Sequence, residues 1–281
     1  MIKNLTDLLT PAYKQRYAVG AFNVYNYETV KGVIAYAAET NTPLIIAFGE
    51  KYLKNMSLPT VKAIVDGLTS GLEIDICLHL DHCSSLENIC RAIQAGFTSV
   101  MYDGSMLSFE KNLKNTKKVC DIAHACDISV EAELGSLASG AHSHEGSAAD
   151  IEKYTVPALA KEFIDYTKAD ALAVSVGTVH GLYKGEANIR IDILEEINRL
   201  LGIPLVLHGD SGLSAGIIKK CISNGISKIN INTELSIHVV ENTKKLLNQN
   251  TMHYSQLSLT QIDFVKEIVE KYTTLFQGAR Q

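Results

Sequence analysis

Short apolar runs alternate along the chain with longer stretches whose apolar residues recur at helical spacing. Short runs rich in β-branched residues are typical of strands, and apolar positions that repeat about every 3.6 residues are typical of amphipathic helices. Successive runs begin about 23 to 42 residues apart, which leaves room for a strand, a crossover helix and two loops. The pattern predicts eight strands, at residues 17–24, 43–49, 76–82, 99–103, 129–134, 171–179, 204–208 and 227–231.

Helical spacing fills the stretches between these strands. Ser85 suits the N-cap of one such helix because its hydroxyl can accept a backbone N–H, and Gly96 suits the left-handed position after the last turn. An open doubly wound sheet would need a glycine-rich phosphate turn after the first strand, and residues 24–26 (VYN) are not one. Repeated strand–helix units therefore predict an α/β protein with a closed (β/α)8 barrel, the TIM barrel. The clearest helices are predicted at residues 27–40, 85–96, 109–126 and 156–167.

The composition is that of a soluble globular protein, with 46% hydrophobic and 20% charged residues. Because no linker or block of charge divides the chain, we expect one domain over 1–281, with a C-terminal helical tail over about 234–281. A net charge of −5 provides no basic field for nucleic acid. The chain shows neither an apolar run of about 18 residues nor a signal peptide, so we expect no membrane association. The six cysteines form no CxxC pair, which is typical of reduced thiols in a cytoplasmic protein.

Histidines gather where predicted strands end. In a barrel of this type, catalytic residues lie at the C-terminal ends of the strands. Three of the nine histidines, His82, His180 and His208, fall at the ends of the third, sixth and seventh predicted strands. Three imidazoles with an open fourth position are the ligand set of a catalytic zinc site, although Co²⁺ or Mn²⁺ could also occupy it. Zinc at such a site polarises a carbonyl as a Lewis acid.

Carboxylates accompany these histidines. Asp81, which need not be a ligand, is a candidate for moving a proton. Strict alternation would send Asp81 and His82 to opposite faces, so both reach the site only if the strand ends at Asp81 and the chain turns. Glu131 and Glu133 share a face and point into the barrel mouth. Buried carboxylates need a metal, a proton-transfer role or a structural polar network. His79 shares the face of Asp81 and is expected to belong to the polar core or to support the site.

Two loops have the character of a phosphate site. Gly209 and Ser211 precede one predicted helix, and Asn232 and Thr233 begin another. Backbone N–H groups and hydroxyls at helix starts suit an anion, and the loops after strands seven and eight usually form the phosphate site of these barrels. Lys184, in the loop after strand six, either adds a charge-assisted contact or lies in solvent.

With these motifs in place, the chain resembles the zinc-dependent class II aldolases of the fructose-bisphosphate/tagatose-bisphosphate family. The resemblance runs from AFNVYN to INTEL through HLDH, DGS, VEAELG, GTVHGLYKG, LHGDSGL and KINI. It implies a TIM barrel, assembled as a homodimer or homotetramer, with Zn²⁺ and often a monovalent cation such as Na⁺ or K⁺. The implied reaction, a step of carbohydrate metabolism such as glycolysis, is reversible C3–C4 cleavage of a ketose 1,6-bisphosphate or ketose 1-phosphate to dihydroxyacetone phosphate and an aldehyde.

The resemblance also implies roles for individual residues. It makes His82, His180 and His208 the zinc ligands and Asp81 the proton donor to the aldehyde oxygen. Glu131 and Glu133 match the acidic strand of the family, one of whose carboxylates can approach the metal. The implied substrate-binding residues are Asn23, Gly181, Lys184, Gly209, Ser211, Asn230, Asn232 and Thr233.

Three positions depart from the family pattern. Gly49 stands where members that bind bisphosphates usually carry a serine for the distal phosphate, so a ketose 1-phosphate is a credible substrate. The loop over 136–150 retains only Glu145 and Asp150 where the family has an acid implicated in proton transfer. Asp210 replaces a small residue, and its carboxylate would repel a phosphate unless it points away or holds a cation.

Other functions remain as alternatives. A metal-dependent hydrolase on the same barrel often carries an HxH pair on the first strand, and the segment AFNV has none. A class I aldolase needs a Schiff-base lysine inside the barrel, but Lys228, the only lysine in the predicted strands, lies near a strand start. A non-catalytic accessory subunit of the aldolase family is expected to lose its metal ligands or Asp81, and all of these are present.

Overall fold

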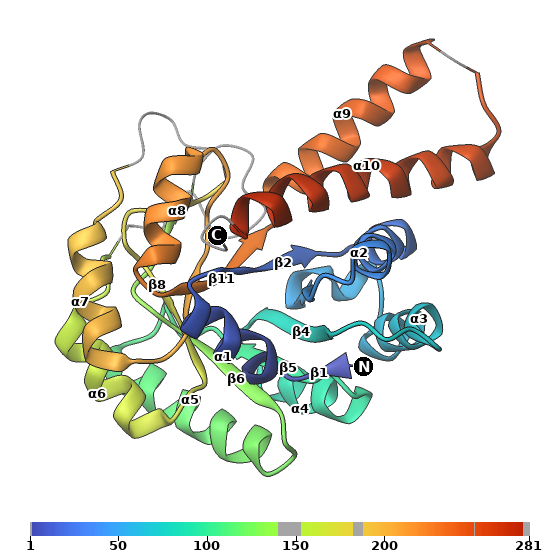
Figure 1. Cartoon of the computed structure of the whole chain (residues 1–281). Coiled ribbons are helices and arrows are strands. Elements are labelled where there is room, and N and C mark those ends of the chain that lie inside the picture. Colours follow the sequence, from blue (N-terminus) through green and yellow to red (C-terminus); the bar gives the residue numbers. More distant parts are fainter. Residues whose placement is uncertain (1, 140–152, 182–187, 250, 278–281) are drawn as a thin grey trace.

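Eight parallel strands close into a barrel ringed by helices, as predicted (Figure 1). The computed structural model describes residues 2–139, 153–181, 188–249 and 251–277. Pairing of the first barrel strand with the last, through Ala21 and Asn230, completes the ring. In barrel order the strands are β2 (Val19–Asn23), β3 (Leu44–Gly49), β4 (Ile76–Cys83), β5 (Ser99–Tyr102), β6 (Ser129–Leu134), β8 (Ala171–Val174), β10 (Leu205–Leu207) and β11 (Ile226–Ile231).

Local signals determine where many of the helices begin and end. The predicted helix over 27–40 coincides with α2, whose N-cap is Asn26. Ser85 accepts a hydrogen bond from the backbone of Asn88, and Gly96 ends the same helix with a φ of 90°, as its sequence predicts. No helix among the described residues is long and apolar enough to cross a membrane. The helices are α1 (Leu5–Gln15), α2 (Tyr27–Thr40), η1 (Glu50–Lys54), α3 (Leu58–Thr69), α4 (Leu86–Ala95), α5 (Phe109–His124), α6 (Pro157–Thr167), α7 (Ile191–Leu201), α8 (Ala215–Ser223), α9 (Thr233–Gln249) and α10 (Tyr254–Phe276).

An apolar plug fills one end of the barrel interior. Helix α1, which the sequence analysis did not predict, contributes Leu5 and Leu9 to a cluster with the inward side chains of Ile45, Cys77 and Val206. Before it, β1 (Ile2–Lys3) pairs with β4. Because water is excluded from this end, the polar side chains farther along the strands are accessible only from the C-terminal mouth.

The sixth barrel strand is shorter than predicted. Residues 171–179 were expected to form one strand, but β8 ends at Val174. Gly177 then adopts a φ of 106°, a conformation that redirects the chain and that side chains disfavour. The chain next forms β9 (Val179–His180), which pairs with β7 (Ala138–Ser139) in a separate two-stranded sheet. The histidine predicted at the end of a barrel strand therefore lies in this short strand.

The two last helices form a hairpin that projects away from the barrel (Figure 1). The C-terminal end of α10 returns to the barrel, where Phe276 is buried and its carbonyl accepts the backbone N–H of Ala18 at 3.2 Å. Along its length α10 packs closely on α2. A Cβ atom at Gly32 would lie 2.6 Å from Val265, so the absence of a side chain permits this approach.

Candidate active site

The end of β4 turns two neighbouring side chains toward the barrel mouth. The pairing of β4 with β5 shifts register between Leu80 and Cys83, and His82 has a φ of 43°. An irregularity of this kind changes the direction of a side chain, so Asp81 and His82 escape strict alternation. The strand, predicted over 76–82, continues to Cys83, and the chain turns at His82 within it, so an end at Asp81 is not required.

Two buried amides hold the carboxylate of Asp81. Nδ2 of Asn23 donates to Oδ2 at 2.9 Å, and Nδ2 of Asn230 donates to Oδ1 at 3.0 Å. Strands β2, β4 and β11 therefore meet at this carboxylate. Burial alone would raise the pKa of Asp81, but the neighbouring His82 and Lys228 lower it below its ordinary value. An ionised Asp81 can accept a proton.

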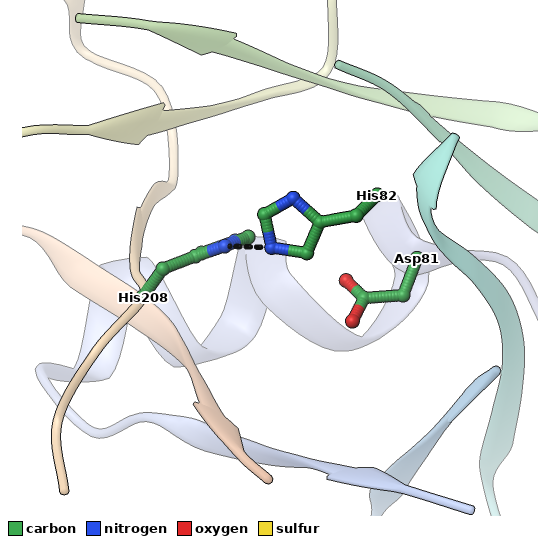
Figure 2. A group of neighbouring side chains, drawn as sticks. All are labelled: Asp81, His82 and His208. Atoms are coloured by element: carbon green, nitrogen blue, oxygen red, sulfur yellow. Dashed lines mark hydrogen bonds between the residues drawn. The ribbon is translucent and has the colours of Figure 1, made fainter. Parts of the chain in front are cut away.

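His82 and His208 face each other across the site (Figure 2). Nε2 of His82 lies 2.7 Å from Nδ1 of His208. Their outer nitrogens meet carboxylates, since Nδ1 of His82 lies 2.9 Å from Oδ2 of Asp103 and Nε2 of His208 lies 2.9 Å from Oε1 of Glu131. An ionised carboxylate only accepts hydrogen bonds, so each imidazole directs an N–H outward to its carboxylate. The two inner nitrogens face the same point and are hydrogen-bonded to each other (Figure 2).

This arrangement fits a divalent metal ion. A metal ion would displace the proton shared by the inner nitrogens and take both nitrogens as ligands. Histidine ligands usually donate their other N–H to a carboxylate or carbonyl, as His82 and His208 do. An oxygen of Asp81 lies within 4.8 Å of both nitrogens, and His82, Asp103 and Glu133 form a second group of the same size.

Beneath His208, Glu131 belongs to a fully buried ionic network. Its Oε2 lies 2.8 Å from Nζ of Lys228 and 3.6 Å from Nε2 of His79. Nδ1 of His79 makes a 2.9 Å hydrogen bond with Ser99, in agreement with a polar core role. Burial alone would raise the pKa of Glu131, but the Lys228 cation and the His208 hydrogen bond lower it to about 2. An ion-paired ammonium is not a nucleophile, which argues against a Schiff base at Lys228.

The carboxylate of Glu133 lies close to His82. Its Oε2 lies 3.7 Å from Nδ1 of His82 and has no hydrogen-bond partner among the described residues. Burial, and then the negative charge of Asp103, raise the pKa of Glu133 well above its ordinary value. A buried carboxylate in this position needs a proton or a cation.

Strand β9 brings His180 to the loop that follows His208. Gly209 packs so closely against β9 that a Cβ atom there would lie 2.2 Å from the carbonyl oxygen of Val179. Gly209 also has a φ of 71°, so glycine is required at this position on both counts. The backbone thus places residue 180 beside the His208 loop. Gly181 directly follows β9, whereas Lys184, Glu145 and Asp150 lie outside the described residues.

The two loops of the predicted phosphate site adjoin each other. The backbone N–H of Gly212 donates to Oε1 of Glu234 at 3.1 Å, which ties the loop after β10 to the start of α9. Ser211 and Thr233 are both buried in these loops. Asn232, which precedes Thr233, is held by hydrogen bonds from two tyrosines described below. The glycines, hydroxyls and helix start that the sequence singled out therefore share one end of the barrel.

Asp210 lies in the first of these loops, and its side chain is buried. Among the described residues, its Oδ2 has no hydrogen-bond partner. Burial, and then the negative charge of Glu234, raise the pKa of Asp210 well above its ordinary value. In its protonated form Asp210 would carry no charge and would not repel a bound anion.

Four residues that contact the predicted site were missed from the sequence. Asp103 was noted only as a strand end, and Lys228 was set aside as lying near a strand start. Tyr25 and Tyr52 received no role, although their hydroxyls reach Asn232. The position of Lys228 on the inward face of a strand could have indicated a role in the site. No local sequence pattern indicates such a role for Tyr25 or Tyr52.

Comparison with known proteins agrees with this geometry. The family model described as fructose-bisphosphate aldolase class-II matches residues 3–281. A sulfofructosephosphate aldolase of Alkalicoccus urumqiensis is 39% identical over 247 residues, covering 88% of this chain and 86% of that protein. A fructose-bisphosphate aldolase of Staphylococcus aureus is 39% identical over 254 residues, or 89% of this chain and 88% of that protein. The crystal structure of the YdjI aldolase of Escherichia coli aligns with a TM-score of 0.86 and 32% identity, covering 100% of this chain and 99% of that chain.

The family match extends over nearly the whole chain, and the relatives share both its length and its barrel. Zinc dependence is characteristic of this family of lyases, and the paired imidazoles of His82 and His208 fit such a metal. The chain therefore belongs to the class II fructose-bisphosphate aldolase family.

Proposed function

We propose that the chain is an active aldolase that reversibly cleaves the C3–C4 bond of a ketose phosphate to dihydroxyacetone phosphate and an aldehyde. The convergence of Asp81, His82 and His208 carries this proposal. A non-catalytic accessory subunit would have no need for an ionised carboxylate held beside two preoriented imidazoles. The substrate is a fructose- or tagatose-type 1,6-bisphosphate or a ketose 1-phosphate.

His82, His180 and His208 are the proposed ligands of a zinc ion, His180 on the strength of the family resemblance. When bound, the metal supplies a Lewis acid for the ketone oxygen and for the negative charge that develops on C3–C4 cleavage. Asp103 and Glu131 orient the two described imidazoles toward the metal position.

Asp81 serves the C4 oxygen of the substrate. In cleavage its ionised carboxylate accepts the proton of the C4 hydroxyl, and in synthesis it returns that proton to the aldehyde oxygen. Asn23 and Asn230 hold both carboxylate oxygens, so the remaining lone pairs keep one orientation toward the mouth. Asn23 and Asn230 are also proposed to contact the substrate close to its reacting carbons.

The two carboxylates of β6 are proposed to have different roles. Glu131, which is ion-paired and hydrogen-bonded, fixes the orientation of His208. Glu133 has an oxygen open to the cluster and is proposed to hold a proton or to approach the metal when substrate is absent.

The loops after β9, β10 and β11 are proposed to bind the phosphate of dihydroxyacetone phosphate. Buried hydroxyls and backbone N–H groups at the start of α9 support this role. A monovalent cation, Na⁺ or K⁺, is proposed to assist the same loops. The proposed residues are Gly181, Lys184, Gly209, Ser211, Asn232 and Thr233.

The protein is further proposed to act in the cytoplasm as a homodimer or homotetramer. All six cysteines are free thiols, which is typical of a reducing compartment. Large apolar side chains are exposed along the α9–α10 hairpin, including Val240 at 63% and Leu259 at 59%, and they support a subunit contact there.

Release of dihydroxyacetone phosphate by the purified protein tests the proposed reaction. The substrates are fructose 1,6-bisphosphate, tagatose 1,6-bisphosphate and the corresponding ketose 1-phosphates, each assayed before and after treatment with a chelator. We expect release that the chelator abolishes and added Zn²⁺ restores. Release that survives complete metal removal, or its absence from every substrate, would contradict the proposal.

A further inference from the structure

Two tyrosines from different strand ends converge on one asparagine at the barrel mouth. Tyr25 follows β2, and its hydroxyl hydrogen-bonds the side chain of Asn232 and also its carbonyl oxygen at 3.2 Å. Tyr52 lies in η1 after β3, and its hydroxyl lies 3.2 Å from Nδ2 of Asn232. The two rings meet edge to face with centroids 4.8 Å apart. Together the two tyrosines form a neutral wall beside Asn232.

The ring of Tyr52 depends on the absence of a side chain at Gly49. A Cβ atom at position 49 would lie 3.2 Å from Cδ2 and 3.3 Å from Cε2 of that ring, closer than ordinary contact. Phe48 supports the ring from the strand, with a centroid separation of 6.5 Å. A side chain at position 49 would therefore require the Tyr52 ring to shift by a few tenths of an ångström. Tyr52 lies in the space toward which that side chain would project.

The two tyrosines of this wall supply no charge that would hold a second phosphate. A phosphate group is held by cations or by several convergent backbone N–H groups, and the side chains of Tyr25 and Tyr52 provide neither. Glu50, which follows Gly49, has its carboxylate fixed by the Ser84 N–H at 3.1 Å and by Nδ2 of Asn88 at 2.7 Å. The same turn also carries Lys51 and Lys54, which are exposed to solvent.

We propose that Tyr52, seated in the space that Gly49 leaves, and Tyr25, which packs against it, select an uncharged, hydroxyl-bearing aldehyde over an aldehyde phosphate. This inference rests on the proposed aldolase function and specifies its substrate. Phenol hydroxyls can both donate to and accept from the hydroxyls of a sugar chain, and the edge-to-face rings offer an apolar surface for its C–H groups. The preferred ketose therefore carries a single phosphate, on C1.

Synthesis from dihydroxyacetone phosphate separates this inference from the proposed function. In D₂O without any aldehyde, an aldolase exchanges a C3 proton of dihydroxyacetone phosphate with solvent, and this exchange measures the proposed function alone. Addition of glyceraldehyde or glyceraldehyde 3-phosphate, each as both enantiomers, then measures aldehyde selection. We expect kcat/KM for glyceraldehyde to exceed that for its phosphate by about tenfold or more.

Variants connect the preference to the wall. Tyr52→Phe keeps the ring and removes the hydroxyl, so kcat/KM for glyceraldehyde should fall about 2- to 10-fold, and by more than the rate of proton exchange does. Gly49→Ser combined with Tyr52→Ala opens the space and should shift the ratio toward glyceraldehyde 3-phosphate by tenfold or more. Tyr166→Phe, on the exposed face of α6, is the control and should change neither quantity. Melting temperatures establish that each variant is folded.

The possible outcomes are distinct. Exchange with a preference for glyceraldehyde that both Tyr52 variants weaken supports the inference. Exchange with equal or better use of glyceraldehyde 3-phosphate by the wild type overturns it and leaves the aldolase function standing. A Tyr52→Phe variant with unchanged kinetics for both aldehydes also overturns it. Failure of dihydroxyacetone phosphate to exchange overturns the proposed function and this inference with it.

Discussion

Nζ of Lys228 lies 2.8 Å from Oε2 of Glu131, and neither side chain is exposed to solvent. The other oxygen of Glu131 meets Nε2 of His208, so the lysine, the glutamate and the histidine form a chain from the barrel interior to its mouth. Lys228 compensates the charge that Glu131 would otherwise carry alone in a site without water. The orientation of His208 thus depends on a cation that does not touch it.

Replacing Lys228 with Met should leave the Glu131 carboxylate buried without its counter-ion. Removal of one partner of a buried ion pair typically costs about 3–5 kcal/mol, because the remaining charge is uncompensated. We expect the free energy of unfolding, measured in urea, to fall by this order. Adding Glu131→Gln to Lys228→Met removes the uncompensated charge and should recover part of the loss. Equal stability of Lys228→Met and the wild type would show that the pair is not needed to hold the fold.

Asp103 should control the affinity of the protein for its metal through His82. Loss of a carboxylate that orients a histidine ligand typically weakens metal binding about 10- to 100-fold. We expect Asp103→Ala to raise the dissociation constant for Zn²⁺ by this factor in a competition titration with a chromophoric chelator. Ser105→Ala is the matched control, because it removes a 2.6 Å hydrogen bond to Asp103 and leaves the contact with His82. A larger effect from Ser105→Ala than from Asp103→Ala would contradict this assignment.

Gly32 and Gly67 both lie within helices, and an alanine should have opposite effects at the two positions. A Cβ atom at Gly32 would lie 2.6 Å from Val265 of α10, whereas one at Gly67 in α3 meets nothing within 4 Å. Gly32→Ala should therefore lower the free energy of unfolding by about 1–3 kcal/mol through overpacking. Gly67→Ala should raise it by about 0.5–1 kcal/mol, since alanine favours the helix. Thermal unfolding of the two variants distinguishes their signs, and a stabilised Gly32→Ala would refute the close packing of α10.

Asp210 should make stability depend on pH, because its folded-state pKa is raised well above the ordinary 3.8. The folded state binds the Asp210 proton more tightly than the unfolded state does. Its contribution to stability is complete below the unfolded pKa and is lost as pH rises toward the folded pKa. Asp210→Asn, which has no proton to lose, should gain stability relative to the wild type over that interval. A stability difference that stays constant from pH 4 upward would contradict this account.

Much of the barrel could be predicted because its signals are local. The predicted strand over 129–134 coincides with β6, and the helix that begins after Ser85 ends at Gly96 as expected. Strand six was predicted too long, because Val176 and Val179 continue the apolar pattern past Val174, where β8 ends. Helix α1 was missed although a capping box of Asn4 and Asp7 and the helical spacing of Leu5, Leu8, Leu9 and Ala12 mark it.

Site residues that lie near strand ends could be predicted from the sequence. Residues whose roles depend on partners from other strands could not. Asp81 and His208 stand at such ends, and the sequence placed them correctly in the barrel mouth. Lys228 acquires its role only through the register that aims it at Glu131. The position of the Tyr52 ring depends on the absence of a side chain at Gly49.

The most direct test of the account compares Asp81→Asn with His208→Ala for metal content and for the rate of dihydroxyacetone phosphate release. Asparagine preserves the shape of Asp81 but cannot accept the C4 proton. We expect Asp81→Asn to keep the zinc content of the wild type while its rate falls about 10²- to 10⁴-fold, and His208→Ala to lose both metal and activity. An Asp81→Asn enzyme of wild-type rate, or one that has lost its metal, would contradict the assignment of Asp81 as the proton-transfer residue beside a histidine-bound zinc.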